Sequence, residues 1–199
     1  MKSSSKLLQI ILVLTFFGIQ NSAVAQQFNQ MFDTKNHPKA KGVWAQVKYP
    51  DGWAAKEVQG PSTLQMFTGP HDGVNVQLQL LIRDFGVDIE NECANNISEA
   101  EWNQSMSDRA SNTVGTNSKK VKVDGKPGFT SDVTRPTQVA DVKMSFAAKQ
   151  LHICHKKTRI LLSCGNTILE ENIQKASQNL TKIESICKNY FTSFVLKEK

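Results

Sequence analysis

Cysteine and histidine are the residue types in this chain best suited to site chemistry. Thiolates and imidazoles can together hold zinc, and cysteines can alternatively pair as disulfides. His152, Cys154 and His155 lie close together, with Cys164 downstream. In a strand, His152 and Cys154 share one face, whereas His155 falls in the turn that follows. This spacing favours disulfides over a metal site, and we expect neither a metal nor a cofactor.

Two further groups of titratable residues are candidate sites. His71-Asp72 places a histidine beside a carboxylate, but the sequence shows no nucleophile motif for it to serve, and turn chemistry accounts for the pair. The acidic loop Asp84–Glu92 carries carboxylates that could hold calcium, but its spacing does not match an EF-hand. The sequence therefore indicates no catalytic residue, and we expect a protein that is not an enzyme.

The first 25 residues indicate where the protein works. Lys2 and Lys6 give a positive start, Leu7–Ile19 is almost wholly apolar, and Ala23-Val24-Ala25 is a small-x-small cleavage signal. This order is typical of a secretory signal peptide, cut here after Ala25. The apolar run of about 13 residues is shorter than the roughly 20 needed to cross a bilayer, so a retained anchor is the less favoured interpretation. We expect a periplasmic or secreted protein with no transmembrane segment after cleavage.

All four cysteines lie in the expected mature chain: Cys93, Cys154, Cys164 and Cys187. An even number in an exported protein predicts two disulfides, for which three connectivities are open. A strand over 158–164 and a helix that folds back along it would span similar lengths, about 20 Å and about 22 Å. Cys187 then approaches Cys154, so this estimate predicts the pairs Cys154–Cys187 and Cys93–Cys164.

Length and charge exclude some classes of protein. Without residues 1–25 the chain suits one domain, which we expect over 41–199 after a flexible N-terminal lead over 26–40. The formal net charge of +6 includes the two lysines of the signal peptide, so the mature protein is mildly basic. Its basic segments are typical of solvated hairpin ends and not of a nucleic-acid binder. Lys156 and Lys157 are candidates for contact with an acidic partner.

Hydrophobic periodicity predicts the secondary structure. In the clearest strand, 74–82, apolar side chains alternate with mostly polar ones. Capping boxes at Ser98–Glu101 and Thr167–Glu170 predict one helix to about Asn112 and a long final helix to about Phe194. The other strands are expected over 43–49, 53–58, 64–67, 118–123, 129–134, 142–154 and 159–164. Two helices that cover a largely antiparallel sheet make an α+β fold.

The segment Val47-Lys48-Tyr49-Pro50-Asp51-Gly52-Trp53 resembles the opening of the Mog1/PsbP-like superfamily. The strand over 74–82, the turn Asp124–Gly128 and the closing segment Tyr190–Phe194 fit the same pattern, which covers residues 43–195. The resemblance implies an α/β/α sandwich around an antiparallel sheet. It also implies a non-enzymatic binding or accessory role, which most members of the superfamily have. The four cysteines and the short first helix depart from the family pattern.

Two tryptophans are candidates for partner contact. Trp44 and Trp53 flank the first turn, and an exposed tryptophan can anchor a binding partner. Both can equally be buried, since a sandwich covers both faces of its sheet, and burial is the favoured interpretation.

Together these features favour an exported, non-catalytic protein that binds a protein partner in the bacterial envelope or outside the cell. A secreted effector or a toxin-neutralising inhibitor is the first alternative, and a small hydrolase or metal-dependent enzyme is the second. An exposed apolar patch would support the binding protein. The enzyme would require a concave pocket with converging titratable groups.

Overall fold

The computed structural model describes residues 26–108, 111–139, 141–169 and 172–197. The predicted signal peptide, residues 1–25, lies outside this part of the chain. No helix within the described ranges is long and apolar enough to cross a bilayer.

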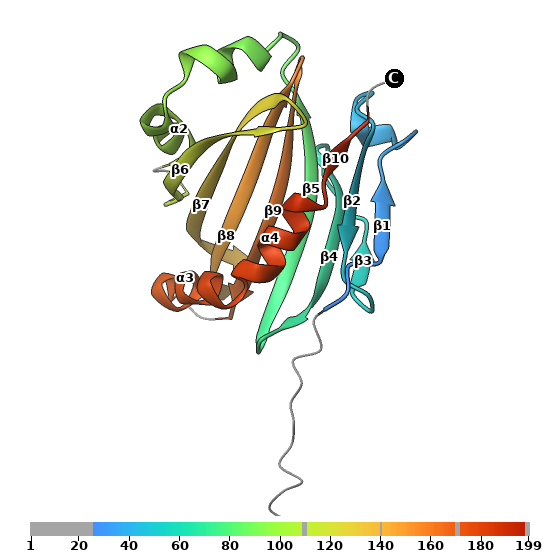
Figure 1. Ribbon diagram of the computed structural model, residues 1–199. Coiled ribbons are helices and arrows are strands. Elements are labelled where there is room, and N and C mark those ends of the chain that lie inside the picture. The colour runs from blue at the N-terminus through green and yellow to red at the C-terminus, as the bar shows by residue number, and fades with distance from the viewer. Residues whose placement is uncertain (1–25, 109–110, 140, 170–171, 198–199) are drawn as a thin grey trace, which may run out of the picture.

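The described residues form one large and one small antiparallel sheet (Figure 1). The large sheet has the strand order β3-β4-β5-β9-β8-β7-β6, and the small sheet has the order β1-β2-β10. The strands of the large sheet are β3 (Ala54–Lys56), β4 (Thr63–His71), β5 (Val74–Asp84), β6 (Val114–Val123), β7 (Lys126–Val139), β8 (Val142–His155) and β9 (Thr158–Ile168). Those of the small sheet are β1 (Gln30–Asp33), β2 (Ala45–Tyr49) and β10 (Val195–Leu196).

The helices are few and short. They are α2 (Glu99–Met106), α3 (Ile173–Lys182) and α4 (Glu184–Thr192), with a 3-10 turn at Pro38–Ala40 and a π-helical turn at Glu92–Asn96. The capping box predicted at Ser98 is present: the Ser98 hydroxyl accepts from the Glu101 amide, and the Glu101 carboxylate accepts from the Ser98 amide. The hydrogen bonds that the Ser98 amide and hydroxyl donate to the Glu101 carboxylate lower the pKa of Glu101.

The end of the chain differs from the single long helix that was predicted. Thr167 and Ile168 belong to β9, and Glu170 lies outside the described residues, so the predicted capping box does not start a helix. The helix starts later, where the Asn172 side chain accepts from the Lys175 amide. It is interrupted at Ile183, whose backbone leaves helical geometry and whose side chain is fully buried. Burial of Ile183 between α3 and α4 therefore decides where the helix breaks.

Other boundaries also differ from the prediction. Residues 26–40 are not a flexible lead throughout, because Gln30–Asp33 forms β1 by pairing with β2. The first helix ends at Met106 and not near Asn112. Strand β7 continues through Pro136 to Val139. Strand β6 begins opposite Thr134, so beyond this point β7 has no neighbour on that side, and the missing amide hydrogen of Pro136 breaks no ladder.

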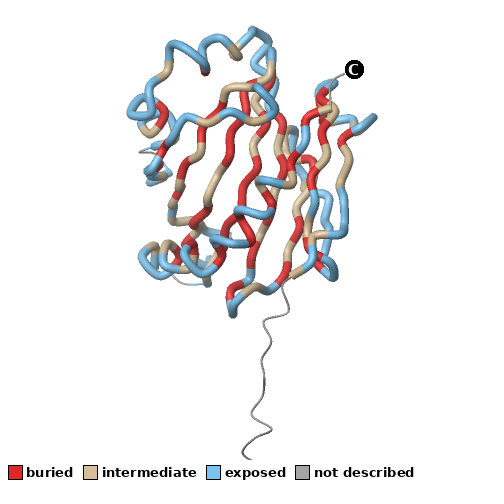
Figure 2. The backbone as a smooth tube through the Cα atoms, in the orientation of Figure 1, coloured by how far each residue is buried: buried red, intermediate tan, exposed pale blue. Residues whose placement is uncertain are grey.

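One face of the large sheet carries the main core. Val76, Leu78, Leu80 and Ile82 on β5 are fully buried there, next to Leu162 on β9. The small sheet covers this face over β4, where Tyr49 stacks on Phe67 at 4.0 Å, and α3 and α4 cover it over β8 and β9. In Figure 2 the buried segments follow the middle strands, and the exposed ones gather at turns and outer elements. This apolar cluster is called the main core below.

Among the described residues, the opposite face is covered only toward β6, β7 and β8, by α2 and the π-helical turn. There Cys93, Trp102, Phe129 and Cys154 form a separate buried cluster, called the α2 cluster below. The α+β class and the antiparallel sheet agree with the sequence prediction. The layers are less regular than a sandwich with one helix on each face, because a second sheet shares the core side.

Candidate functional site

The two disulfides lie on opposite faces of the large sheet and fix the helical elements to it. Cys93 is bonded to Cys154 on β8, and Cys164 on β9 is bonded to Cys187 on α4. Two disulfides were predicted, but the predicted pairs Cys154–Cys187 and Cys93–Cys164 are wrong. Because β9 continues to Ile168 and the helix starts only after Asn172, α4 passes over the middle of β9 and places Cys187 above Cys164.

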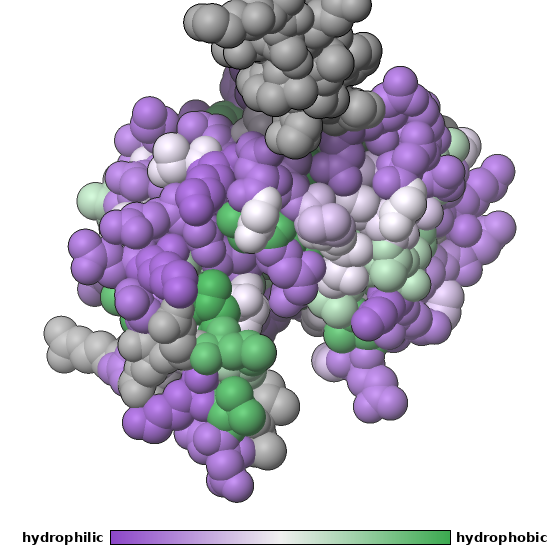
Figure 3. Space-filling view, turned by 90° about the horizontal axis from the view of Figure 1, so that it is seen from below, coloured by the Kyte–Doolittle hydropathy of each residue, from purple (hydrophilic) through white to green (hydrophobic). Residues whose placement is uncertain are grey.

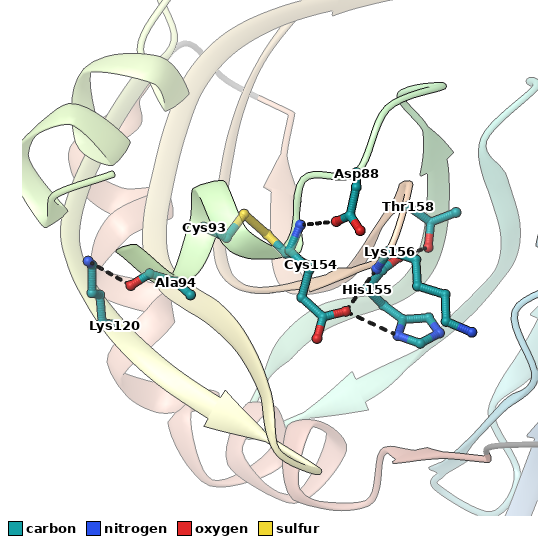
Figure 4. The surroundings of a disulfide bond; sticks show 9 residues. Asp88, Cys93, Ala94, Lys120, Cys154, His155, Lys156 and Thr158 are labelled. Carbon is teal, nitrogen blue, oxygen red and sulfur yellow. Dashed lines mark hydrogen bonds and ion pairs between the residues drawn. A yellow bond between two sulfur atoms is a disulfide. The ribbon is translucent and has the colours of Figure 1, made fainter. Parts of the chain in front are cut away.

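Cys154 points to the other face of the sheet. It lies opposite Arg159 in the β8–β9 ladder, whereas Lys149 lies opposite Cys164. Cys154 and Cys164 therefore differ in the face they present, so the loop that carries Cys93 can reach only Cys154. Figure 4 shows this bond between the π-helical turn and the strand. Since every cysteine is in a disulfide, no thiolate is left to bind zinc as the sequence alternative required.

A groove lies on the core face of the sheet, between α4 and the strands that α4 leaves uncovered. It has a volume of about 670 Å³, and its lining includes Asn117, Lys119, Asp132, Lys149, Glu184, Lys188, Phe191 and Thr192. Figure 1 shows α4 in front of the sheet, with β6 and β7 to its left. The Cys164–Cys187 bond holds α4 over β9, so the helix cannot spread over β6 and β7. This depression is called the α4 groove below.

Charged side chains in the α4 groove are paired with one another. The Lys149 Nζ lies 3.7 Å from an oxygen of Asp132 and 3.6 Å from an oxygen of Glu184. The Asn117 side chain donates to the other oxygen of Asp132 at 2.8 Å. The Lys149 and Asp132 side chains are partly exposed and Glu184 is exposed, and ion pairs at a protein surface are each worth about 1 kcal/mol or less, so a partner can replace them at little cost.

The groove also offers an apolar contact and two outward-facing lysines. Phe191 is half-buried and packs against the main core, while Lys119 and Lys188 are exposed. An apolar floor with a polar, charged rim is typical of sites that bind a segment of another molecule. The arrangement can therefore recognise a partner group by charge and by contact with one ring.

Helix α2 closes the neighbouring edge of the sheet. The carboxylate of Glu99, the side-chain amide of Asn103 and the hydroxyl of Ser107 accept from the amides of Lys120, Ser118 and Gly115, at 2.8, 3.2 and 3.0 Å. These three acceptors, spaced four residues apart, satisfy outward-facing donors of the outermost strand, β6. An incoming strand therefore finds this part of the edge occupied.

The residues predicted to contact a partner are separated in the structure. Trp53 is buried, as the favoured interpretation predicted, and fills the space beside Gly69, where a Cβ would lie 2.6 Å from its ring, so it is not exposed for contact with a partner. Trp44 is half-buried, donates from Nε1 to Asp33 at 3.0 Å and lies under the Lys35 ammonium. Neither tryptophan lines the α4 groove.

Lys156 and Lys157 are exposed in the turn between β8 and β9. Backbone hydrogen bonds hold this turn against the loop that contains Glu90. The Lys156 amide donates to the Glu90 carboxylate, and the Lys156 and Lys157 carbonyls accept from the amides of Ile89 and Phe85, respectively. Figure 4 shows Lys156 and His155 next to the Cys93–Cys154 bond. The ammonium groups of Lys156 and Lys157 remain candidates for contact with an acidic partner.

His71 has neighbours that the sequence did not reveal, but not in a catalytic order. Its Nε2 lies 3.3 Å from the Ser185 hydroxyl and 3.6 Å from an oxygen of Asp72, and its Nδ1 lies 3.1 Å from Gln26. In a serine–histidine–aspartate triad the two ring nitrogens serve the serine and the aspartate separately. Here the same nitrogen faces both groups, so this geometry does not relay a proton.

The acidic loop uses its carboxylates locally. Asp84 accepts from the Gly86 amide at 2.8 Å, Asp88 accepts from the Glu90 amide at 2.9 Å, and Glu90 lies 3.4 Å from the Lys126 ammonium. Across the described residues, no three histidine, cysteine or acidic side chains gather as a metal-binding group.

The end of the molecule seen from below in Figure 3 is mainly hydrophilic. Its hydrophobic areas are narrow, and some lie beside grey residues that the structure does not describe. This view does not show the broad apolar patch that would mark that end as a docking surface.

The residues of the α4 groove were not predicted as a site. One signal was available in β8, where Lys149 occupies a position that strand alternation assigns to the buried face, between Ala147 and Leu151. A lysine at an inward-facing position indicates that this part of the face is not covered by the core.

Comparison with known proteins finds matches among solved structures. No family model matches this sequence, and no curated protein matches it. A crystal structure of a protein from Bacteroides thetaiotaomicron VPI-5482 is similar with a TM-score of 0.46 and 12% identity, covering 87% of this chain and 50% of that one. The present chain thus spans about half the length of that protein.

The Ran-binding protein Mog1p of Saccharomyces cerevisiae is also similar in structure. Its TM-score is 0.43 at 10% identity, and the match covers 76% of this chain and 89% of Mog1p. Mog1p gives its name to the Mog1/PsbP-like superfamily, which the sequence resembles.

Proposed function

We propose that this protein is an exported, non-catalytic binding protein that engages a protein partner through the α4 groove. The observation that carries the proposal is the groove itself: an open depression beside a helix that a disulfide holds in place. Its lysines and acids pair only weakly across the groove, so they are available to a partner. The two disulfides support an oxidising compartment outside the cytoplasm.

The partner segment that suits the groove carries acidic groups beside an apolar side chain. Acidic groups would meet Lys119 and Lys188 on the two sides of the groove, and the apolar side chain would meet Phe191. Charges at the rim mainly steer association, whereas contact with the ring limits dissociation.

Site-specific photo-crosslinking tests this proposal in cells that express the full chain. We would place a photoreactive residue at Thr192 in the groove and, as the control, at the exposed Lys56 on the far edge strand β3. We expect a defined partner to crosslink from Thr192 and not from Lys56. Equal crosslinking from both positions would contradict the proposal.

Matched substitutions then test the groove by affinity. Thr192→Trp, which fills the groove, should abolish binding of the crosslinked partner. Lys188→Glu should weaken it about tenfold by reversing a rim charge, whereas Lys56→Glu should leave it unchanged. If Lys188→Glu and Lys56→Glu behave alike, the partner binds elsewhere.

A further inference from the structure

Two arginines face each other on the sheet face opposite the main core. Arg83 on β5 and Arg159 on β9 are directly opposite in the antiparallel ladder. Each guanidinium carbon lies 5.2 Å from the centre of the Phe85 ring. Like charges at directly opposite positions destabilise a sheet unless another group offsets their repulsion.

No acidic group of the described residues offsets this charge. Neither guanidinium forms an ion pair or a side-chain hydrogen bond with any residue that the structure describes. The nearest acids in sequence are engaged elsewhere: Asp84 with the Gly86 amide, Asp88 with the Glu90 amide, and Glu90 with Lys126 and the Lys156 amide. Within the described residues the two positive charges therefore remain unneutralised, and an anionic ligand could neutralise them.

Aromatic rings hold the more buried of the two arginines in position. The Arg159 guanidinium lies 5.2 Å from the Phe85 ring and 5.8 Å from the Trp102 ring. Trp102 is itself fixed, since it stacks on Phe129 at 4.2 Å and donates to Ser131 at 3.1 Å. Cation–π contacts are each worth about 0.5–2 kcal/mol, and they orient the cation without neutralising it.

The surroundings of Arg159 favour binding of an anion. Burial lowers the pKa of Arg159, and the nearby positive charge of Arg83 lowers it further. Arg83 is exposed, and Phe85 is 39% exposed, so a ligand can reach both guanidiniums from solvent. An arginine with a partly buried head group ordinarily has a carboxylate or another anion beside it.

We propose that Arg83 and Arg159 form a binding site for a phosphate group. Guanidinium forks match the oxygens of phosphate in bidentate geometry. A phosphate monoester carries about −1.5 to −2 charges at neutral pH, which balances two arginines, whereas a carboxylate carries one. The phosphate group belongs either to a small soluble molecule or to a lipid headgroup. This site lies on the opposite face of the sheet from the α4 groove.

Titration of the full mature protein with inorganic phosphate tests the site. The arginine side-chain Nε–Hε signals in a ¹⁵N-correlated NMR spectrum should shift for Arg83 and Arg159, and calorimetry should give the affinity. Arg83→Gln, at an exposed position, should weaken phosphate binding about tenfold or more, because a hydrogen bond to a charged group is lost.

Arg135 provides a matched control. It is exposed and lies 5.1 Å from the Phe146 ring, so it has the same type of cation–π contact but no second arginine opposite it in the ladder. Arg135→Gln removes the same charge and should leave phosphate binding within about twofold of the wild type. Arg159→Lys should keep the charge but lose the fork, and so weaken binding as Arg83→Gln does.

Two further probes identify the ligand chemistry and its source. Acetate at equal ionic strength should bind far more weakly than phosphate; equal binding would overturn the phosphate assignment in favour of a carboxylate. Vesicles that contain phosphatidic acid, whose headgroup is a phosphate monoester, would assign the phosphate to a lipid headgroup if they sediment the wild type but not Arg83→Gln, and no sedimentation would assign it to a soluble molecule. Unchanged arginine signals in phosphate, or equal effects of Arg83→Gln and Arg135→Gln, would overturn the proposal.

Discussion

The main core and the α2 cluster lie on opposite faces of one sheet and are built differently. The main core is continuous and apolar, and the small sheet, α3 and α4 close it. The α2 cluster has only Cys93, Trp102, Phe129 and Cys154 as its buried apolar members, and it lies among polar groups. The His152 ring lies edge-on to the Trp102 ring, and the Ser131 hydroxyl accepts a hydrogen bond from the indole nitrogen of Trp102.

This contrast shows two ways to fix an element to a sheet. Where a large apolar area is buried, as in the main core, packing supplies most of the constraint, and the Cys164–Cys187 bond adds to it at α4. Where it is not, as for α2 and the π-helical turn, hydrogen bonds, stacked rings and a disulfide supply the missing constraint. The second arrangement leaves charged groups such as Arg159 near the surface, which is why the phosphate site is proposed there.

The largest expected effect separates the two disulfides. Cys93–Cys154 closes a separation of 61 residues and Cys164–Cys187 one of 23 residues. Chain entropy therefore predicts losses of about 4 kcal/mol for Cys93→Ala/Cys154→Ala and about 3 kcal/mol for Cys164→Ala/Cys187→Ala. Urea unfolding without reductant gives both free energies. The reverse order would show that packing of Cys187 in the main core outweighs chain entropy.

Truncation in the main core should have the next largest effect. Leu80 is fully buried, so Leu80→Ala should cost about 3 kcal/mol through lost burial and the cavity left behind. The matched control is Leu81→Ala on the opposite face, where the side chain is half-buried and the loss should be about 1 kcal/mol. Both values come from urea unfolding. Equal losses would mean that the two faces do not differ as described.

The pH dependence of stability tests the α2 cluster. Burial, with a smaller contribution from the charge of Arg159, lowers the pKa of His152 from 6.5 to about 3. Below pH 6.5 the unfolded chain therefore binds a proton that the folded protein does not. The contribution of neutral His152 to the free energy of unfolding is fully present above pH 6.5. It falls as the pH decreases, by about 2 kcal/mol between pH 6.5 and pH 5.

His152→Gln removes this titration while His37, His71 and His155 stay in place. The free energy of unfolding, measured in urea at several pH values, should lose the corresponding slope in His152→Gln. A slope equal to that of the wild type would show that His152 is protonated in the folded protein.

The smallest expected effect concerns the edge that α2 closes. Asn103→Ala removes the acceptor of the Ser118 amide and should cost about 1 kcal/mol. Hydrogen exchange of the Ser118 amide should become faster while the amides of β5 stay protected. Gln104→Ala, at an exposed position on the same helix, serves as the control. Equal exchange in both variants would indicate that water satisfies this amide as well as Asn103 does.

Local patterns in the sequence were sufficient for several features. Alternation along Val74–Asp84 predicted the central strand, because one face of that strand is buried and the other is not. The capping box at Ser98 predicted the start of α2, because its two hydrogen bonds connect residues three positions apart. Four cysteines in a chain with a signal-peptide pattern predicted two disulfides.

The tertiary structure decided the features that depend on distant residues. The cysteine pairs depend on where β9 ends and where α3 begins, and β9 extends to Ile168 because it pairs there with Ser145 on β8, a contact that no local pattern encodes. Burial of Trp53 against Gly69, and the four residues of β1 paired with β2, have the same origin.

Both proposed sites were also decided in three dimensions. The sequence contains Arg83 and Arg159 at a separation of 76 residues, and only the β5–β9 register makes them direct neighbours. The α4 groove exists because a disulfide holds α4 over β9 and leaves Asp132 and Lys149 uncovered. Sequence determines which face a side chain occupies through the period of its strand, whereas what covers that face is decided by packing between distant segments.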